Sequence, residues 1–197
     1  MKAISLLNKL LYNNNIWRKR NMIQTFLEFK GTWRTYQQRV LDRFDNYNSD
    51  KKIHIVAAPG SGKTTLGIEL IKRINEPALI LVPSLTIRQQ WYDRIVEAFL
   101  KDGYKTQDYL SQDLKKPAII TISTYQAMHS ALTKYTGKLR EDNLQEEVDY
   151  HDFSLIDVLK KHHVKTLCLD ECHHLRSEWW KALEKLKKNY QTYIRFP

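Results

Sequence analysis

The sequence predicts an α/β fold in which a parallel sheet is flanked by helices. Four short apolar runs alternate along the chain with four stretches of helical periodicity. This alternation is typical of parallel strands joined by right-handed helical crossovers. The predicted strands are 53–56, 78–82, 118–122 and 166–170, and the predicted helices are 63–74, 85–100, 125–132 and 178–186.

The first predicted strand runs into a turn of small residues and then into a helix, which is the arrangement of a phosphate-binding loop (P-loop). Gly60 and Gly62 let the backbone approach phosphate oxygens, and Lys63 supplies an ammonium group for the outer phosphates. The hydroxyl group of Thr64 suits Mg²⁺. A glycine turn without a ligand is the competing interpretation, which the strand–loop–helix context disfavours. The predicted nucleotide-binding residues of the loop are Pro59, Gly60, Ser61, Gly62, Lys63, Thr64 and Thr65.

Two adjacent carboxylates, Asp170 and Glu171, end the last predicted strand. In a P-loop fold this strand end lies beside the phosphate-binding loop, so Asp170 is expected to hold Mg²⁺ and Glu171 to polarise the attacking water. Acidic residues also favour the first turn of a helix, but the presence of the loop at Lys63 favours catalysis. The predicted catalytic residues are Lys63, Asp170 and Glu171, and the predicted metal ligands are Thr64 and Asp170.

These residues resemble a known family. The segment Asp170-Glu171-Cys172-His173 is similar to the DExH form of motif II in superfamily 2 helicases and translocases, and Ala57 to Thr64 is similar to their motif I. The similarity is greatest to the branch that contains restriction translocating subunits and related repair translocases. It implies a RecA-like domain that uses ATP and Mg²⁺.

Further elements of the resemblance follow in the expected order. Arg34-Thr35-Tyr36-Gln37 is similar to the Arg-x-Tyr-Gln element that precedes motif I, which implies that Gln37 reads the adenine edge. Leu81-Val82-Pro83-Ser84 resembles motif Ia, and Ser123-Thr124-Tyr125-Gln126 resembles the later Thr-Tyr-Gln element. Both elements contact a nucleic-acid strand in the family, and an arginine follows motif Ia closely. The candidate nucleic-acid contacts are Pro83, Ser84, Arg88 and Thr124.

The resemblance covers one RecA-like domain. We expect residues 1–30 to be an N-terminal extension and 31–197 to be the ATP-binding domain, without a second RecA-like domain. Motif III is expected near 190–194, close to where the sequence stops. A helicase closes two such domains around ATP, so this chain, interpreted as a truncated or split motor, is expected to bind nucleotide but not to unwind a duplex. Its ATP hydrolysis is expected to be weak or absent without the second domain. Its expected partners are nucleic acid and a second RecA-like domain or subunit.

Acidic residues gather in an insertion at about 134–153, between the Thr-Tyr-Gln element and motif II. A solvated loop or helix face is the preferred interpretation of such a charge run. The alternative is a family-specific insertion that contacts a partner or shields the basic strand-binding channel.

Composition narrows the class of protein. The formal net charge of +10, from 32 Lys and Arg against 22 Asp and Glu, favours a polyanionic partner. The resemblance to helicases and translocases implies that this partner is DNA rather than RNA. The two cysteines, Cys168 and Cys172, do not suit a disulfide framework and favour a reducing, cytoplasmic location. The apolar stretch near the start is far shorter than the roughly 20 residues of a membrane span, so no membrane association is expected.

Three functions fit these residues. We prefer the ATP-binding N-terminal domain of a DNA helicase or restriction-type translocase. A nucleic-acid-binding or regulatory module with a RecA-like fold and little or no ATPase activity is the alternative from another class, and nucleic-acid-stimulated turnover would separate the two. An unrelated P-loop ATPase is the third, which the elements at Gln37 and Thr124 disfavour.

Overall fold

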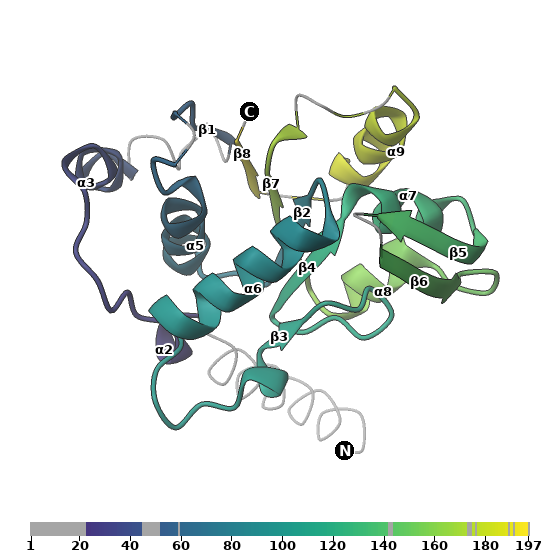
Figure 1. Cartoon of the computed structure of the whole chain (residues 1–197), viewed down its shortest axis with the longest axis horizontal. Helices are drawn as coiled ribbons and strands as arrows, with labels where there is room; N and C mark the ends of the chain where they lie inside the picture. Colours follow the sequence, from purple (N-terminus) through teal and green to yellow (C-terminus); the bar gives the residue numbers. More distant parts are fainter. Residues whose placement is uncertain are drawn as a thin grey trace, which may run out of the picture.

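The computed structural model describes residues 23–44, 52–58, 60–141, 144–172, 175, 177–188, 190 and 192–196 (Figure 1). Its centre is a six-stranded sheet in the order β1-β8-β7-β2-β4-β3, in which all neighbouring strands are parallel. The predicted α/β fold class is therefore confirmed. The strands are β1 (Lys52–His54), β2 (Ala78–Val82), β3 (Leu110–Ser111), β4 (Ile120–Thr124), β7 (Thr166–Leu169) and β8 (Thr192–Arg195).

Strands β2, β4 and β7 are buried along their whole length. Helices cover both faces of the sheet, which explains why these strands read as unbroken apolar runs. Successive side chains of β2 enter different cores. Ile80 and Val82 belong to one hydrophobic cluster, and Leu79 and Leu81 belong to the other.

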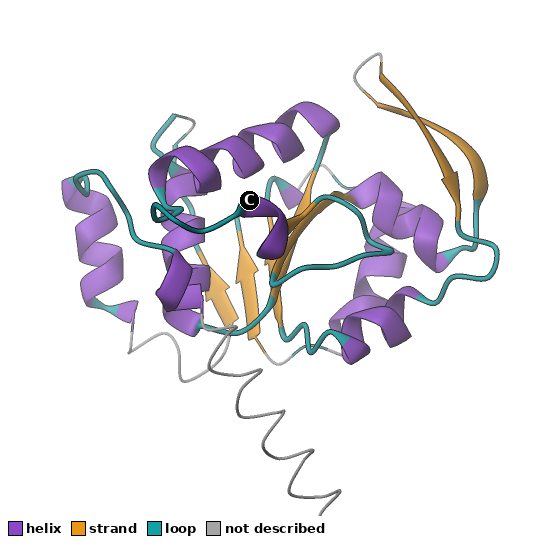
Figure 2. Ribbon diagram, turned by 90° about the horizontal axis from the view of Figure 1, so that it is seen from below, coloured by secondary structure: helices purple, strands orange, loops and turns teal. Residues whose placement is uncertain are grey.

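The helices form a layer on each side of the sheet (Figure 2). All four predicted helices and all four predicted strands begin and end within two residues of their predicted bounds. No helix in the described ranges is long and apolar enough to cross a membrane. The first layer holds α5 (Lys63–Ile74) and α6 (Leu85–Ala98), and the second holds α7 (Tyr125–Leu132), α8 (Leu155–Lys161) and α9 (Ser177–Lys187).

The described structure begins with a segment that packs into the first layer. Helix α2 (Ile23–Phe26) is followed by an isolated bridge between Leu27 and Leu100. The side chains of Ile23, Phe26 and Leu27 are fully buried. Residues 23–27 thus contribute to the core, although the sequence analysis assigned residues 1–30 to an extension, of which 1–22 lie outside the described residues. Two further elements of this region are α3 (Thr35–Asp42) and the 3₁₀ helix η1 (Thr106–Asp108).

Strand β8 occupies the place where motif III was expected. It lies between β1 and β7, and it is the only strand that pairs with β1 within the described sheet. Ile194 and Phe196 are fully buried. The end of the described chain therefore holds the strand that supports β1, which leads into the predicted phosphate-binding loop.

The sequence analysis preferred a solvated loop or helix face for the acidic insertion, and the described structure differs from both. The insertion forms an antiparallel hairpin of β5 (Thr136–Glu141) and β6 (Leu144–Asp149). Lys138 lies opposite Glu147 in the register, and opposite charges across a strand pair stabilise it. Leu139 in β5 and Tyr150 just after β6 are buried in the second core, so the hairpin is anchored to that core along its length.

Candidate nucleotide-binding and nucleic-acid-binding sites

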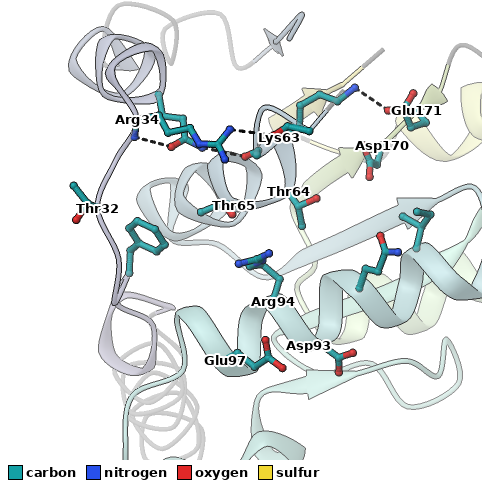
Figure 3. A pocket seen from close by; sticks show the side chains of 16 residues that line it. Thr32, Arg34, Lys63, Thr64, Thr65, Asp93, Arg94, Glu97, Asp170 and Glu171 are labelled. Carbon is teal, nitrogen blue, oxygen red and sulfur yellow. Dashed lines mark hydrogen bonds and ion pairs between the residues drawn. The ribbon is translucent and has the colours of Figure 1, made fainter. Parts of the chain in front are cut away.

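The carboxyl ends of β1 and β7 meet at one edge of the sheet, because both strands are parallel and only β8 separates them. The loop after β1 and the acidic pair after β7 line a common cavity of about 790 Å³ (Figure 3). Most of the predicted nucleotide-site residues lie here, whereas Ser61 does not line the cavity and Pro59 lies outside the described residues. The predicted residues that line it are Gln37, Gly60, Gly62, Lys63, Thr64, Thr65, Asp170 and Glu171.

Lys63 and Glu171 form an ion pair across this cavity. The Lys63 Nζ atom lies 2.7 Å from Glu171 Oε1, and Figure 3 shows the two side chains pointing toward each other. Glu171 has a φ of +48°, a left-handed conformation that is uncommon for residues other than glycine. Such conformations concentrate at functional sites, where the surrounding structure maintains them.

Asp170 is the buried member of the acidic pair, with 6 % of its surface exposed. Its Oδ2 atom accepts a hydrogen bond of 2.8 Å from the indole nitrogen of Trp91. Burial raises the pKa of the carboxyl group, the Trp91 hydrogen bond opposes this rise, and the neighbouring Glu171 adds to it. The backbone is fixed as well, because Tyr125 donates a hydrogen bond to the Asp170 carbonyl oxygen at 2.9 Å.

The donor set fits Mg²⁺ bound together with phosphate. The hydroxyl group of Thr64 and the carboxylate of Asp170 line the same cavity, and both are oxygen ligands of the kind that Mg²⁺ prefers. Among the described residues, no group of three or more His, Cys, Asp or Glu side chains is arranged to hold a metal ion. A protein site of few ligands suits Mg²⁺, which keeps waters and takes further oxygens from phosphate.

Three side chains from the segment at the start of α3 hold three successive carbonyl groups of the loop. The guanidinium of Arg34 donates to the Gly60 carbonyl at 3.0 Å, and the hydroxyl of Tyr36 donates to that of Ser61. The Gln37 side-chain nitrogen donates to the Gly62 carbonyl at 3.2 Å. This clamp fixes the loop conformation from outside the loop.

Gly62 cannot carry a side chain in this arrangement. Its φ is +91°, and a β-carbon would lie 2.8 Å from the Gln37 side-chain nitrogen. Gly60 also has a positive φ, of +72°, but a β-carbon there would meet no atom within 4 Å. The two glycines thus have different roles: Gly60 provides backbone freedom, while Gly62 provides both freedom and close approach.

Gln37 has a structural role that the sequence analysis did not predict. It is 3 % exposed, and its Oε1 atom accepts a hydrogen bond of 3.0 Å from the Arg34 backbone while its nitrogen holds the loop. A carboxamide has two donor hydrogens and two acceptor lone pairs, so one of each is left for adenine. Adenine recognition by Gln37 stays a prediction, and the structural role in the clamp is an addition to it.

The candidate nucleic-acid contacts lie at the carboxyl ends of β2 and β4. Val82 and Thr124 are paired in the register, so the helices that follow them begin side by side. The hydroxyl of Ser84 caps α6, and that of Thr124 caps α7. Thr124 is fully buried and acts as a helix cap, while Pro83, Ser84 and Arg88 are partly exposed.

The sequence analysis missed one wall of the candidate nucleotide cavity. This wall is a face of α6, whose residues recur at helical spacing, together with Phe29 and Thr32. Figure 3 shows Arg94 and Glu97 rising from α6 below the loop. The spacing was visible in the sequence, but only the position of α6 beside α5 shows that this face lines the cavity. The α6 residues are Ile87, Gln90, Asp93, Arg94 and Glu97.

Comparisons with known proteins identify the family and the fold of the chain. Residues 30–196 match the family model described as "Type III restriction enzyme, res subunit". Two curated relatives are each called "Putative DNA 3'-5' helicase Rad25". The one from Halobacterium salinarum is 31% identical over 93 residues, which are 47% of this chain and 15% of the relative. The one from Haloarcula marismortui is 34% identical over 92 residues, which are 47% of this chain and 14% of the relative.

A solved structure shows the same fold. The Hef helicase domain of Pyrococcus furiosus superposes with a TM-score of 0.54 at 12% sequence identity, covering 83% of this chain and 32% of that structure. This chain therefore spans only a small part of the proteins that it matches. With the family match over most of its length, the chain belongs to the Type III restriction enzyme, res subunit family and is the first RecA-like domain of a superfamily 2 helicase.

Proposed function

We propose that this domain binds ATP with Mg²⁺ and, together with a second RecA-like domain, couples ATP hydrolysis to movement along DNA. The observation that carries the proposal is the contact of 2.7 Å between Lys63 Nζ and Glu171 Oε1, beside Asp170, in one cavity. The loop supplies a cation, and the end of β7 supplies one buried and one partly exposed carboxylate. This set of charges suits a magnesium-bound polyphosphate and a water to be activated.

Each side chain has a distinct role in this proposal. Lys63 binds the outer phosphates, while Thr64 and Asp170 would hold Mg²⁺, which supplies positive charge that neutralises the phosphate oxygens. Glu171 orients the attacking water and takes its proton. Gln37 holds both the loop and the adenine edge, and Trp91 keeps the Asp170 carboxylate in position.

The ion pair implies an order of events at the site. Without an anion, Glu171 neutralises Lys63 and its Oε1 atom is engaged. Phosphate oxygens compete with Glu171 for the Lys63 ammonium group. Binding of the triphosphate therefore releases the carboxylate at the moment when a base is required.

Substitution of Lys63 and Glu171 tests the proposal, with binding of a fluorescent ATP analogue as the primary measurement. Lys63→Ala is expected to weaken binding at least about tenfold, because it removes a charge-assisted contact. Glu171→Gln is expected to bind as tightly as the wild type or more tightly, because Lys63 loses its competitor, and to lose any DNA-stimulated turnover.

Lys72→Ala is the matched control, since Lys72 lies on the same helix and pairs with Glu69 at 3.1 Å, outside the cavity lining. Its ATP affinity should equal that of the wild type. Equal affinity of Lys63→Ala and Lys72→Ala would refute the nucleotide site. ATP binding without turnover that DNA stimulates would instead point to a module that uses ATP only as a ligand.

A further inference from the structure

A second cavity, of about 200 Å³, lies next to the candidate nucleic-acid contacts. It is enclosed by the first turn of α6, the loop at 112–115, the start of α7 and the end of the hairpin strand β6. Figure 1 shows the hairpin on the same side of the molecule as the start of α7. The cavity thus joins the strand ends that resemble motif Ia and the Thr-Tyr-Gln element to the acidic insertion.

Opposite charges face each other in this cavity. Arg88 and Lys115 contribute cationic groups, while Glu147 and Asp149 contribute carboxylates from β6. The Lys115 ammonium lies 5.5 Å from the centre of the Tyr150 ring, which holds it at the hairpin side. Asp113 also lines the cavity, but its carboxylate accepts a hydrogen bond of 2.8 Å from the Lys115 backbone.

The carboxylate of Asp149 is held in an ionised state. It accepts hydrogen bonds from the His151 backbone at 3.0 Å and from the Thr136 hydroxyl at 2.8 Å. These two donors lower the pKa of Asp149, and the charge of Lys115 lowers it further. A fixed negative charge therefore stands beside Lys115 at neutral pH.

Ser123 points to a ligand at this place. It is fully buried at the end of β4 and lines the cavity, and its hydroxyl has no hydrogen-bond partner within the described part of the chain. A buried hydroxyl without a partner is unusual, because most buried polar side-chain atoms are satisfied. An oxygen of a bound group would satisfy it.

The position of the carboxylates is set by packing. Leu139 and Tyr150 are buried in the second core, and the Tyr150 backbone donates a hydrogen bond of 3.0 Å to the Tyr135 carbonyl. These contacts fix the hairpin against the second core, next to the cavity. Glu147 and Asp149, two residues apart on β6 and so on the same face of the strand, are thereby presented to the cavity.

We propose that this cavity is a phosphate subsite on the path of the nucleic-acid strand, in which Lys115 is a further binding residue and Glu147 and Asp149 are counter-charges that the strand must displace. This inference rests on the proposed action on DNA. A phosphate group of the nucleic-acid strand competes with the two carboxylates for Arg88 and Lys115. The hairpin therefore lowers the affinity of this cavity for the strand.

Neutralising the hairpin carboxylates tests this inference. The double variant Glu147→Gln/Asp149→Asn keeps both side-chain shapes, and the new carboxamide at position 149 would retain an oxygen that accepts from Thr136 and His151. We expect its affinity for a short fluorescein-labelled oligothymidylate, measured by anisotropy at low salt, to rise about three- to tenfold. If the double variant unfolds at a lower temperature, Glu147→Gln alone should show a smaller rise.

The matched control is Glu28→Gln/Asp102→Asn, which changes the net charge equally. Glu28 and Asp102 form weak surface pairs with Lys101 and Lys30 at the far end of α6. If the control and the hairpin variant bind the oligothymidylate with equal affinity, this inference is wrong, while the proposed action on DNA still stands. Absence of DNA binding by the wild type and both variants would overturn the proposed action on DNA and this inference with it.

Lys115→Ala provides a second measurement. It is expected to reduce the magnitude of the slope of log affinity against log salt by about 1, because one fewer phosphate is neutralised. A purely structural role of Lys115 on Tyr150 would change the melting temperature and leave this slope unaltered. An unchanged slope would remove Lys115 from the proposed subsite.

Discussion

The buried carboxylate of Asp170 lowers the stability of the folded domain at neutral pH. Its carboxyl group is buried, and burial raises its pKa above the usual value, although Trp91 donates a hydrogen bond to it. The folded state therefore binds a proton more readily here than the unfolded state does. The contribution of Asp170 to stability is fully present at low pH and is lost as the pH rises through the raised pKa.

Asp170→Asn should consequently stabilise the domain at neutral pH while weakening Mg²⁺-dependent ATP binding. Stabilising substitutions commonly gain about 0.5–2 kcal/mol. Urea unfolding followed upward from about pH 4, the ordinary pKa of an aspartate, should show that the difference in stability from the wild type grows with pH until Asp170 is ionised, because only the wild type ionises. A variant that is less stable than the wild type at every pH would contradict this account of Asp170.

Single residue types were predictable from the sequence, but their partners were not. The motifs selected Lys63, Asp170 and Glu171, which share one cavity in the structure. They did not show that Gln37 holds the loop or that Thr124 is a buried cap. A motif indicates which chemistry a residue type suits, whereas the hydrogen bonds of its side chain depend on neighbours distant in the sequence.

Helices α5 and α6 are set against each other at one close contact. A β-carbon on Gly67 would lie 2.7 Å from the outer ring carbon Cη2 of Trp91 and 3.0 Å from the ring of Phe196. Gly67 sits within α5, where glycine is otherwise unfavourable by up to about 1 kcal/mol relative to alanine. The glycine therefore allows the close packing that places Trp91 beside Asp170.

Gly67→Ala is expected to destabilise the domain by about 1–2 kcal/mol, because overpacking costs about 1–3 kcal/mol and exceeds the gain in helix propensity. Urea unfolding measures the loss, and weaker Mg²⁺-dependent ATP binding should accompany it as Trp91 shifts. Lys72→Ala adds an alanine to the same helix away from Trp91 and should lose far less stability. If Gly67→Ala is as stable as the wild type, the contact does not position α6.

The hairpin is the element that the sequence analysis interpreted wrongly. Its charged residues indicated a solvated loop or helix face, but Lys138 and Glu147 become cross-strand neighbours only when the chain folds back. The apolar signal was weak, since Leu139 and Tyr150 are separated by most of the hairpin. Long apolar strands such as β2 were predictable because burial on both faces dictates every residue.

Across the domain, the last described strand supports the first one. β8 is the only described partner of β1, and β1 leads into the predicted phosphate-binding loop. Ile194 of β8 is fully buried in the first core, which also contains Ile53. Loss of packing around β8 should therefore reach the nucleotide site through β1.

Ile194→Ala is expected to cost about 2–5 kcal/mol of stability, the range for buried aliphatic truncations. It should also weaken ATP binding under conditions where the domain remains folded. Leu159→Ala is the matched control, because Leu159 is buried in the second core on α8, away from the loop. Equal loss of ATP affinity in the two variants would show that β8 has no special link to the site.

The local sequence by itself determined the alternation of strands and helices, the glycine turn between β1 and α5, and the acidic strand end, since these depend on residue types at short spacing. Tertiary structure alone decided the clamp on the loop carbonyls, the α6 wall of the cavity and the place of the hairpin beside Arg88. The physical reason is distance along the chain. These contacts join segments that only the packing of the sheet and its two helix layers brings together.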